Sequence, residues 1–376
     1  MREPAASDGR DASAQGLLRR AIRWGATNRL RAVLAGVAGL VSVTVVTVGG
    51  FWLLSIGSEE GGVTLSEVLQ SLDAGALSQA KDAAMTLRGQ KSATLEDIAG
   101  AVYTLGVVAA AEAADTWTKD RQKKFLLAAR YLEEARSRGF PPGRRGRGLY
   151  LLGKCLYEGG RIPASRPFLA DALRADPKNR DEIRCLLAGA YLEDSPPDLE
   201  KALHYNTLYL SAPSLPEAKR QVGIMQRAQI LLAMGKPEEC MAALKDIPAK
   251  SALRAEATVM QGRVQMYEAQ QLRNQGAPSP QQLEEAREKY EKAIKTLQLA
   301  QGRDTLSNQA TRKAMYLIGV CFREIGDHRA AMRQFARTRQ LFPETPEGLA
   351  ASFQEAEISR DLGRDDEAVA AYRRGL

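Results

Sequence analysis

The stretch around Gly148 nearly matches a phosphate-binding loop, and it is the part of the sequence that most suggests chemistry. Gly148, Gly153 and Lys154 have the spacing of G-x-x-x-x-G-K-[ST], in which backbone N–H groups and the lysine hold phosphates. However, Cys155 stands where a hydroxyl would hold Mg²⁺, and the residues between the glycines are bulky and apolar. Because no strand pattern precedes it, we predict that this stretch is a repeat helix and not a nucleotide site.

Groups for acid–base, nucleophilic or metal chemistry do not gather elsewhere in the sequence. The two histidines, His204 and His328, have no cysteine or acid at ligand spacing, and hydrolase and metalloprotease motifs are absent. Neighbouring acids such as Glu284 and Glu285 fall at the starts or on the faces of predicted helices, where they compensate the helix dipole or meet solvent. We therefore predict no catalytic residue, no cofactor site and no metal site, and we do not expect an enzyme.

The cysteines predict neither a disulfide framework nor a zinc site, because they are widely spaced and form no C-x-x-C pair. We expect them to be small buried hydrophobic residues on helices, with a Cys155–Cys185 bridge between neighbouring repeats as the one pairing to check. The four are Cys155, Cys185, Cys240 and Cys321.

The net charge of +8 is unevenly distributed along the chain. Residues 1–31 carry seven arginines against three acids, whereas residues 58–376 carry 46 basic and 42 acidic residues. The larger part is thus close to balanced, and a nucleic-acid-binding domain would show a denser basic surface. We predict no nucleic-acid partner.

Residues 32–57 carry no charge and predict one transmembrane helix. A bilayer core requires roughly 20 apolar residues in a helix, so this run is long enough to span. Arginines precede it and Glu59 and Glu60 follow it, which predicts a cytoplasmic N-terminus and an extracytoplasmic remainder. A cleaved signal peptide is the alternative, although the apolar run is long for one. Ala32 and Gly36 form a small-xxx-small pair that would permit a homo-oligomer.

Beyond residue 62 a pattern of two helices recurs about every 30–45 residues, a period typical of solenoids. In the clearest copy, 314–343, small residues and bulky residues alternate at helical spacing around a Gly-Asp turn, and proline ends the second helix. We expect the small residues to lie where helices cross, because only small side chains allow close axes. The residues that carry this pattern are Met315, Ile318, Gly319, Phe322, Gly326, Asp327, Ala331, Phe335, Thr338 and Pro343.

This pattern resembles the tetratricopeptide repeat, and the copy at 149–177, with Gly153, a Gly159-Gly160 turn and Pro177, resembles it too. Weaker copies fill the rest, including one at 255–300 with a long insert through 270–280. The resemblance implies an all-α, right-handed solenoid of about eight helix pairs over 63–376. With the basic, largely disordered tail at 1–31 and the membrane helix at 32–57, this gives three parts.

The resemblance also implies a concave groove, lined by first helices, that binds a protein or peptide. Aromatic residues and cations expected on that groove suit an extended peptide with an acidic group. The family's carboxylate clamp for chaperone tails is not present. The candidate groove residues are Tyr150, Lys154, Tyr157, Arg263, Tyr267, Tyr316, Arg323 and Phe353.

The sequence as a whole predicts a membrane-anchored scaffold or adaptor, with the repeats in the periplasm of a bacterium. One alternative is the reverse topology, which resembles that of some mitochondrial import receptors. Another is the N-terminal part of a larger enzyme or sensor, since the chain stops at Leu376 within a repeat and without the polar capping helix that solenoids usually need.

Overall fold

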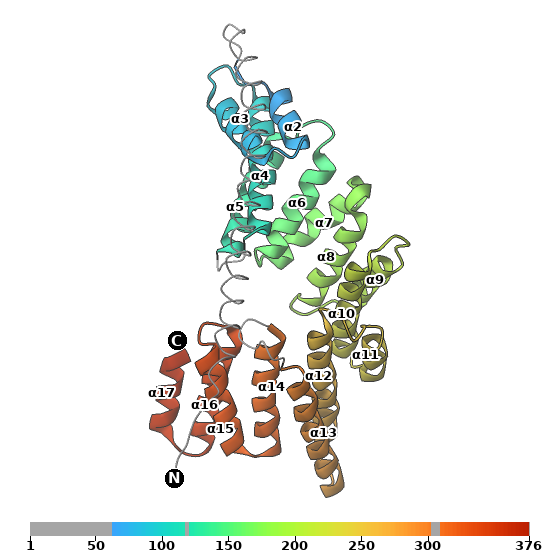
Figure 1. The fold of residues 1–376 in the computed structure, drawn as a ribbon, viewed down its shortest axis with the longest axis vertical. Helices are drawn as coiled ribbons and strands as arrows, with labels where there is room; N and C mark the ends of the chain where they lie inside the picture. The colour runs from blue at the N-terminus through green and yellow to red at the C-terminus, as the bar shows by residue number, and fades with distance from the viewer. Residues whose placement is uncertain (1–61, 117–119, 302–308, 376) are drawn as a thin grey trace, which may run out of the picture. The chain divides into compact units, whose positions relative to one another are not determined.

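The computed structural model describes residues 62–116, 120–301 and 309–375. The membrane helix predicted at 32–57 and the tail at 1–31 lie outside the described residues. Within these ranges the chain forms α-helices and one short 3₁₀ turn, with no strand. The helices, labelled as in Figure 1, are α2 (Leu65–Asp73), α3 (Leu77–Gly89), α4 (Leu95–Ala114), α5 (Arg121–Arg138), α6 (Arg145–Glu158), α7 (Ile162–Ala175), α8 (Arg180–Leu192), α9 (Leu199–Leu210), α10 (Glu217–Ala233), α11 (Pro237–Leu244), α12 (Arg254–Arg273), α13 (Pro280–Leu299), α14 (Gln309–Ile325), α15 (His328–Leu341), α16 (Pro346–Asp361) and α17 (Asp365–Gly375).

The described helices pair in chain order into eight hairpins, from α2 with α3 to α16 with α17 (Figure 1). Each even-numbered helix is the first helix of its hairpin, and it also contacts the first helix of the next hairpin. The first helices from α2 to α16 therefore form one continuous layer, which we call the inner layer. The second helices fill the spaces between successive first helices.

The turn between two helices of a hairpin requires glycine where the backbone turns back sharply. Gly326, between α14 and α15, has φ +88°, and Gly160, between α6 and α7, has φ +78°. Residues other than glycine rarely adopt a positive φ. Both predicted turns therefore form where the sequence supplies a glycine. Asp327 follows Gly326 and caps α15, because its side chain accepts a hydrogen bond from the Ala330 N–H at 2.8 Å.

The predicted role of small residues at helix crossings is confirmed at four first helices. At each of them a methyl group added to a glycine would lie 2.6–2.8 Å from a bulky side chain of the second helix. These distances are shorter than a van der Waals contact, so glycine is what lets the two helices approach. The pairs are Gly106 with Leu132, Gly153 with Leu169, Gly262 with Leu297, and Gly319 with Phe335.

The insert expected at 270–280 is partly helical, and residues 274–279 connect α12 to α13. The α12 and α13 helices have 20 residues each, and only a short turn separates Arg273 from Pro280. Ser279 caps α13 and forms reciprocal hydrogen bonds with Gln282, which starts the helix at Pro280. The extra residues therefore lengthen both helices of this hairpin and also form the connection between them.

The cysteines are free thiols in the structure. Cys155, Cys240 and Cys321 are fully buried, as the sequence predicted, whereas Cys185 is partly exposed. A Cys155–Cys185 bridge is not formed. The Cys185 Sγ instead lies 3.9 Å from the Gln226 Oε1 on α10.

One described helix, α4, is long and apolar enough to cross a bilayer by length and composition. Twelve of its residues, including Val102 and Tyr103, are buried against neighbouring helices of the repeats. Because α3, α5 and α6 all contact it, the apolar character of α4 is explained by its place in the core.

Candidate functional site: a cavity on the inner helix layer

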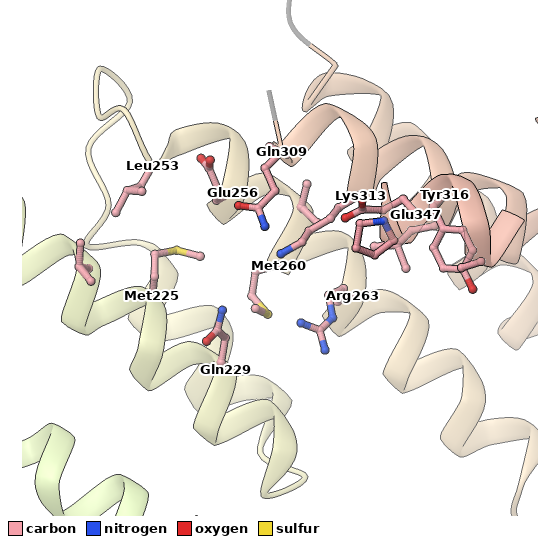
Figure 2. Close-up of a pocket in the computed structure, with 16 residues that line it drawn as sticks. Met225, Gln229, Leu253, Glu256, Met260, Arg263, Gln309, Lys313, Tyr316 and Glu347 are labelled. Atoms are coloured by element: carbon pink, nitrogen blue, oxygen red, sulfur yellow. The ribbon is translucent and has the colours of Figure 1, made fainter. Parts of the chain in front are cut away.

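Four consecutive helices of the inner layer, α10, α12, α14 and α16, enclose a cavity of about 590 Å³. Its volume falls in the range of small-molecule and peptide side-chain sites. Figure 2 shows that residues of these helices point into a common space. The lining residues are Val222, Met225, Gln229, Leu253, Glu256, Val259, Met260, Arg263, Gln309, Ala310, Lys313, Tyr316, Leu317, Pro346, Glu347 and Ala350.

One wall of the cavity is apolar. Met225 on α10 and Met260 on α12 face each other across it, next to Leu253 (Figure 2). Both methionines are buried below 10% exposure, and both belong to the core cluster that joins α10, α11 and α12. Thioether side chains are flexible and polarisable, so this wall can adapt to an apolar group of varied shape.

Two cations enter the cavity from neighbouring helices. Arg263 comes from α12 and Lys313 from α14, and both side chains are directed toward the space beside Met260 (Figure 2). Arg263 is open to the cavity on one side, but the protein atoms around it desolvate the guanidinium and lower its pKa. Neither side chain forms an ion pair with an acid in the described part of the chain.

Two carboxylates line the same cavity. The Oε2 atom of Glu256 is buried and has no hydrogen-bond partner among the described residues. Glu347, at the start of α16, forms an ion pair with Arg312, with 3.5 Å between Nε and Oε2. The cavity therefore holds one hydrogen-bond acceptor without a donor, the Oε2 of Glu256. It also holds two cations that form no ion pair among the described residues, Arg263 and Lys313.

A second, smaller cavity of about 320 Å³ lies between α8 and α10, again on the inner layer. Val222 lines both cavities and is 48% exposed, so the two spaces adjoin at this residue. Lys219 and Glu182 line the second cavity. Hollows on the inner layer thus extend over five successive hairpins, from α8 to α16.

Of the eight groove candidates, Arg263 and Tyr316 line the larger cavity. Three other candidates lie on α6. Lys154 and Tyr157 form hydrogen bonds to acids at either end of α8, and Tyr150 is buried. The Lys154 Nζ is 2.6 Å from the Glu182 Oε1, and the Tyr157 hydroxyl donates to the Glu193 Oε1 at 2.9 Å. Tyr150 is buried, and burial raises the pKa of its hydroxyl well above the usual range.

The remaining three candidates do not line the larger cavity. Arg323 donates to the Gln354 Oε1 at 2.5 Å and to the Glu357 Oε2 at 3.0 Å, which ties α14 to α16. Tyr267 packs against the core cluster of α10, α11 and α12. Phe353 is 39% exposed and its ring lies 6.1 Å from that of Tyr372.

Sequence reasoning missed most of the cavity residues. Lys313 lies three positions before Tyr316 and so shares its helix face, a spacing that the sequence does show. Met225 and Met260 are harder to find, because methionine at helical spacing also indicates an ordinary core. Glu256 resembles any other acid in the first turn of a helix.

The tetratricopeptide-repeat family matches the chain at residues 118–180 and again at residues 313–345. The first match includes α6 and α7, and the second includes α15 and most of α14. Comparison with curated proteins gives no match at the sequence level.

Among solved structures, the fold is similar to the apo form of the quorum sensor NprR from B. thuringiensis, with 15% identity and a TM-score of 0.53. That alignment covers 83% of this chain and 85% of NprR. A human IFIT1 dimer with m7Gppp-AAAA is also similar, with 15% identity, a TM-score of 0.51, and coverage of 85% and 77%. At such low identity these likenesses concern the fold alone.

The described residues hold no group of three or more side chains that could bind a metal ion. What the cavity offers is a preformed apolar wall, two cations and unsatisfied acceptors, an arrangement suited to holding a ligand. Two segments of the chain, residues 118–180 and 313–345, thus match the tetratricopeptide repeat, and the described helices form an all-α stack of similar hairpins.

Proposed function

We propose that the protein is a membrane-anchored adaptor that binds an extended segment of another protein on its inner helix layer, without catalysis. The observation that carries this proposal is the cavity bounded by α10, α12, α14 and α16. A preformed cavity limits the ordering cost of binding, because its walls are held by the core. The two similar folds have very different ligands or roles in their names, so the choice of ligand depends on this cavity's own residues.

Charge and residue type in the cavity support a protein segment as ligand. Its polar groups are two cations, two carboxylates, the amides of Gln229 and Gln309 and a tyrosine hydroxyl. Such a mixed set can form hydrogen bonds with a peptide backbone, while the methionine wall takes an apolar side chain. An extended peptide can also continue into the adjoining cavity past Val222.

Site-specific photocrosslinking tests this proposal in intact membranes. We expect p-benzoylphenylalanine in place of Gln229, which is exposed within the cavity, to form a discrete adduct with one partner protein. The same group in place of Gln298, exposed on the second helix α13, is the matched control and should not form that adduct. Mass spectrometry identifies the adduct. Equal adducts at both positions, or none at Gln229, would contradict binding on the inner layer.

We also propose that residues 32–57 anchor the chain, with the N-terminus in the cytoplasm and the repeats on the periplasmic side. A Gln298→Cys variant should react with a membrane-impermeant maleimide applied to intact spheroplasts. The parent protein should react slowly, because burial raises the pKa of Cys155 and Cys321 to about 12 and of Cys185 and Cys240 to about 11. The thiolate is the reacting species, and it is scarce at neutral pH in these sites. If the variant is labelled only after the membrane is disrupted, the repeats lie on the cytoplasmic side and the proposed topology is wrong.

A further inference from the structure

Several cations on first helices form ion pairs that tie one first helix to the next. Within the larger cavity, Arg263 and Lys313 have no acidic partner among the described residues. The tying pairs are Lys154 with Glu182 at 2.6 Å, Arg273 with Glu324 at 2.5 Å, and Arg323 with Glu357 at 3.0 Å.

We infer that the cavity binds a peptide segment in which a carboxylate lies next to an apolar side chain. The carboxylate binds between the Arg263 guanidinium and the Lys313 ammonium group. The apolar side chain packs against Met225 and Met260 (Figure 2). This inference rests on the proposed function, and it names the chemistry that the partner must present to the same site.

The environment of Arg263 gives the physical reason for an acidic ligand. Arg263 is exposed toward the cavity, and the protein atoms on its other sides desolvate the guanidinium and lower its pKa. A ligand carboxylate can accept charge-assisted hydrogen bonds from this guanidinium, and such bonds are about twice as strong as neutral ones. The guanidinium can donate two parallel bonds to one carboxylate, and Lys313 adds a third from the adjacent helix.

Glu256 and Glu347 explain why a peptide fits this cavity better than a nucleic acid. Both line the cavity with the two cations, so a chain of phosphates would meet like charges there. The buried Oε2 of Glu256 lacks a donor, and a peptide backbone N–H can supply one. A single acidic group flanked by amides and an apolar side chain satisfies all these groups together.

The test uses the full-length protein in detergent micelles and a display library of random 12-residue peptides. Selected peptides are synthesised with a fluorophore, and dissociation constants are measured by anisotropy. We expect the selected set to be enriched in Asp, Glu or a free C-terminal carboxylate beside Leu, Ile, Met or Phe. The Arg263→Gln, Lys313→Gln double variant should weaken binding by about tenfold or more, because two charge-assisted contacts are lost.

A matched control removes the same charges from the second helices. Lys295 on α13 and Arg333 on α15 are exposed and form no ion pair in the described structure, so Lys295→Gln with Arg333→Gln should leave binding within about twofold. Met260→Gln tests the apolar wall separately and should weaken binding of the same peptides. Circular dichroism of each variant confirms that the helices are retained.

Two altered peptides distinguish a side-chain carboxylate from a C-terminal one. Replacement of the acidic side chain by its amide removes the first source, and C-terminal amidation removes the second. Loss of about tenfold in affinity on either change supports the inference and identifies the source. A phosphate-containing oligonucleotide that competes for the site better than the peptide would overturn it.

The outcomes also separate this inference from the proposed function. One outcome would overturn the acidic specificity alone. In it, the selected peptides lose binding in Met260→Gln, which shows that they bind the cavity, but they are neutral or basic and are insensitive to the charge variants. If the selected peptides bind equally to every cavity variant, both the specificity and the inner-layer site are wrong.

Discussion

Replacing Phe335 with alanine is expected to lower the free energy of local opening of the α14–α16 region by about 3–5 kcal/mol. Phe335 is fully buried on α15 and lies against the Gly319 backbone of α14 and the Tyr316 ring, with 5.8 Å between the ring centroids. Its removal leaves a cavity that the rigid helix crossing cannot close. Tyr316, which lines the larger cavity, then loses its support.

Amide hydrogen exchange in the full-length chain measures this effect helix by helix, which suits a repeat protein whose hairpins open separately. Phe353→Ala is the matched control, because Phe353 is 39% exposed on the neighbouring α16. It should cost about 1–2 kcal/mol, clearly less than Phe335→Ala, because more than a third of its side chain stays in contact with water. Equal losses of protection in the two variants would show that Phe335 does not hold this crossing.

The second large effect is expected at Gly348, in the first turn of α16. A methyl group at this position would overlap the carbonyl oxygen of Phe342 and lie 2.8 Å from its carbonyl carbon. A side chain could rotate away, but these are backbone atoms at the end of α15. Gly348→Ala should therefore force the two helices apart and cost about 3 kcal/mol, the upper part of the range for overpacking.

The control for Gly348→Ala is Gly89→Ala at the end of α3, where an added methyl group meets no atom within 4 Å. There the change should be neutral or stabilising by up to about 1 kcal/mol, since alanine favours helix and restricts the unfolded chain. Hydrogen exchange of α15 and α16 in one variant, and of α3 in the other, gives the comparison. A stabilising effect at both glycines would mean that α15 and α16 are not in close contact.

The repeat architecture could be predicted from the sequence because its determinants are local. Gly319 and Phe335 belong to one hairpin. Their spacing in the sequence indicates which side of each helix faces the other and where the two helices cross. The sequence located the insert at 270–280 but not its division between helix and connection, because packing decides where α12 ends and α13 begins. The capping pair Ser279 and Gln282 was the sequence signal that favoured helix.

The candidate site was predicted only in part, because its composition depends on contacts between hairpins. Lys154 and Lys313 are both lysines on first helices, yet one is paired with Glu182 across to the next hairpin and the other opens into the cavity. The difference depends on which acid the neighbouring first helix places opposite, 28 residues away in the case of Glu182. No pattern within a single repeat carries this information.

In four hairpins a bulky side chain of the second helix packs directly on a glycine of the first helix, and these contacts build the inner layer and its cavity. A double-mutant cycle of Gly319→Ala and Phe335→Ala, read by hydrogen exchange, tests this packing most directly. We expect Gly319→Ala to destabilise the parent, where its methyl group would lie 2.6 Å from the Phe335 ring, but to be neutral or stabilising once Phe335 is alanine. Effects of the two substitutions that add to within about 0.5 kcal/mol would contradict it.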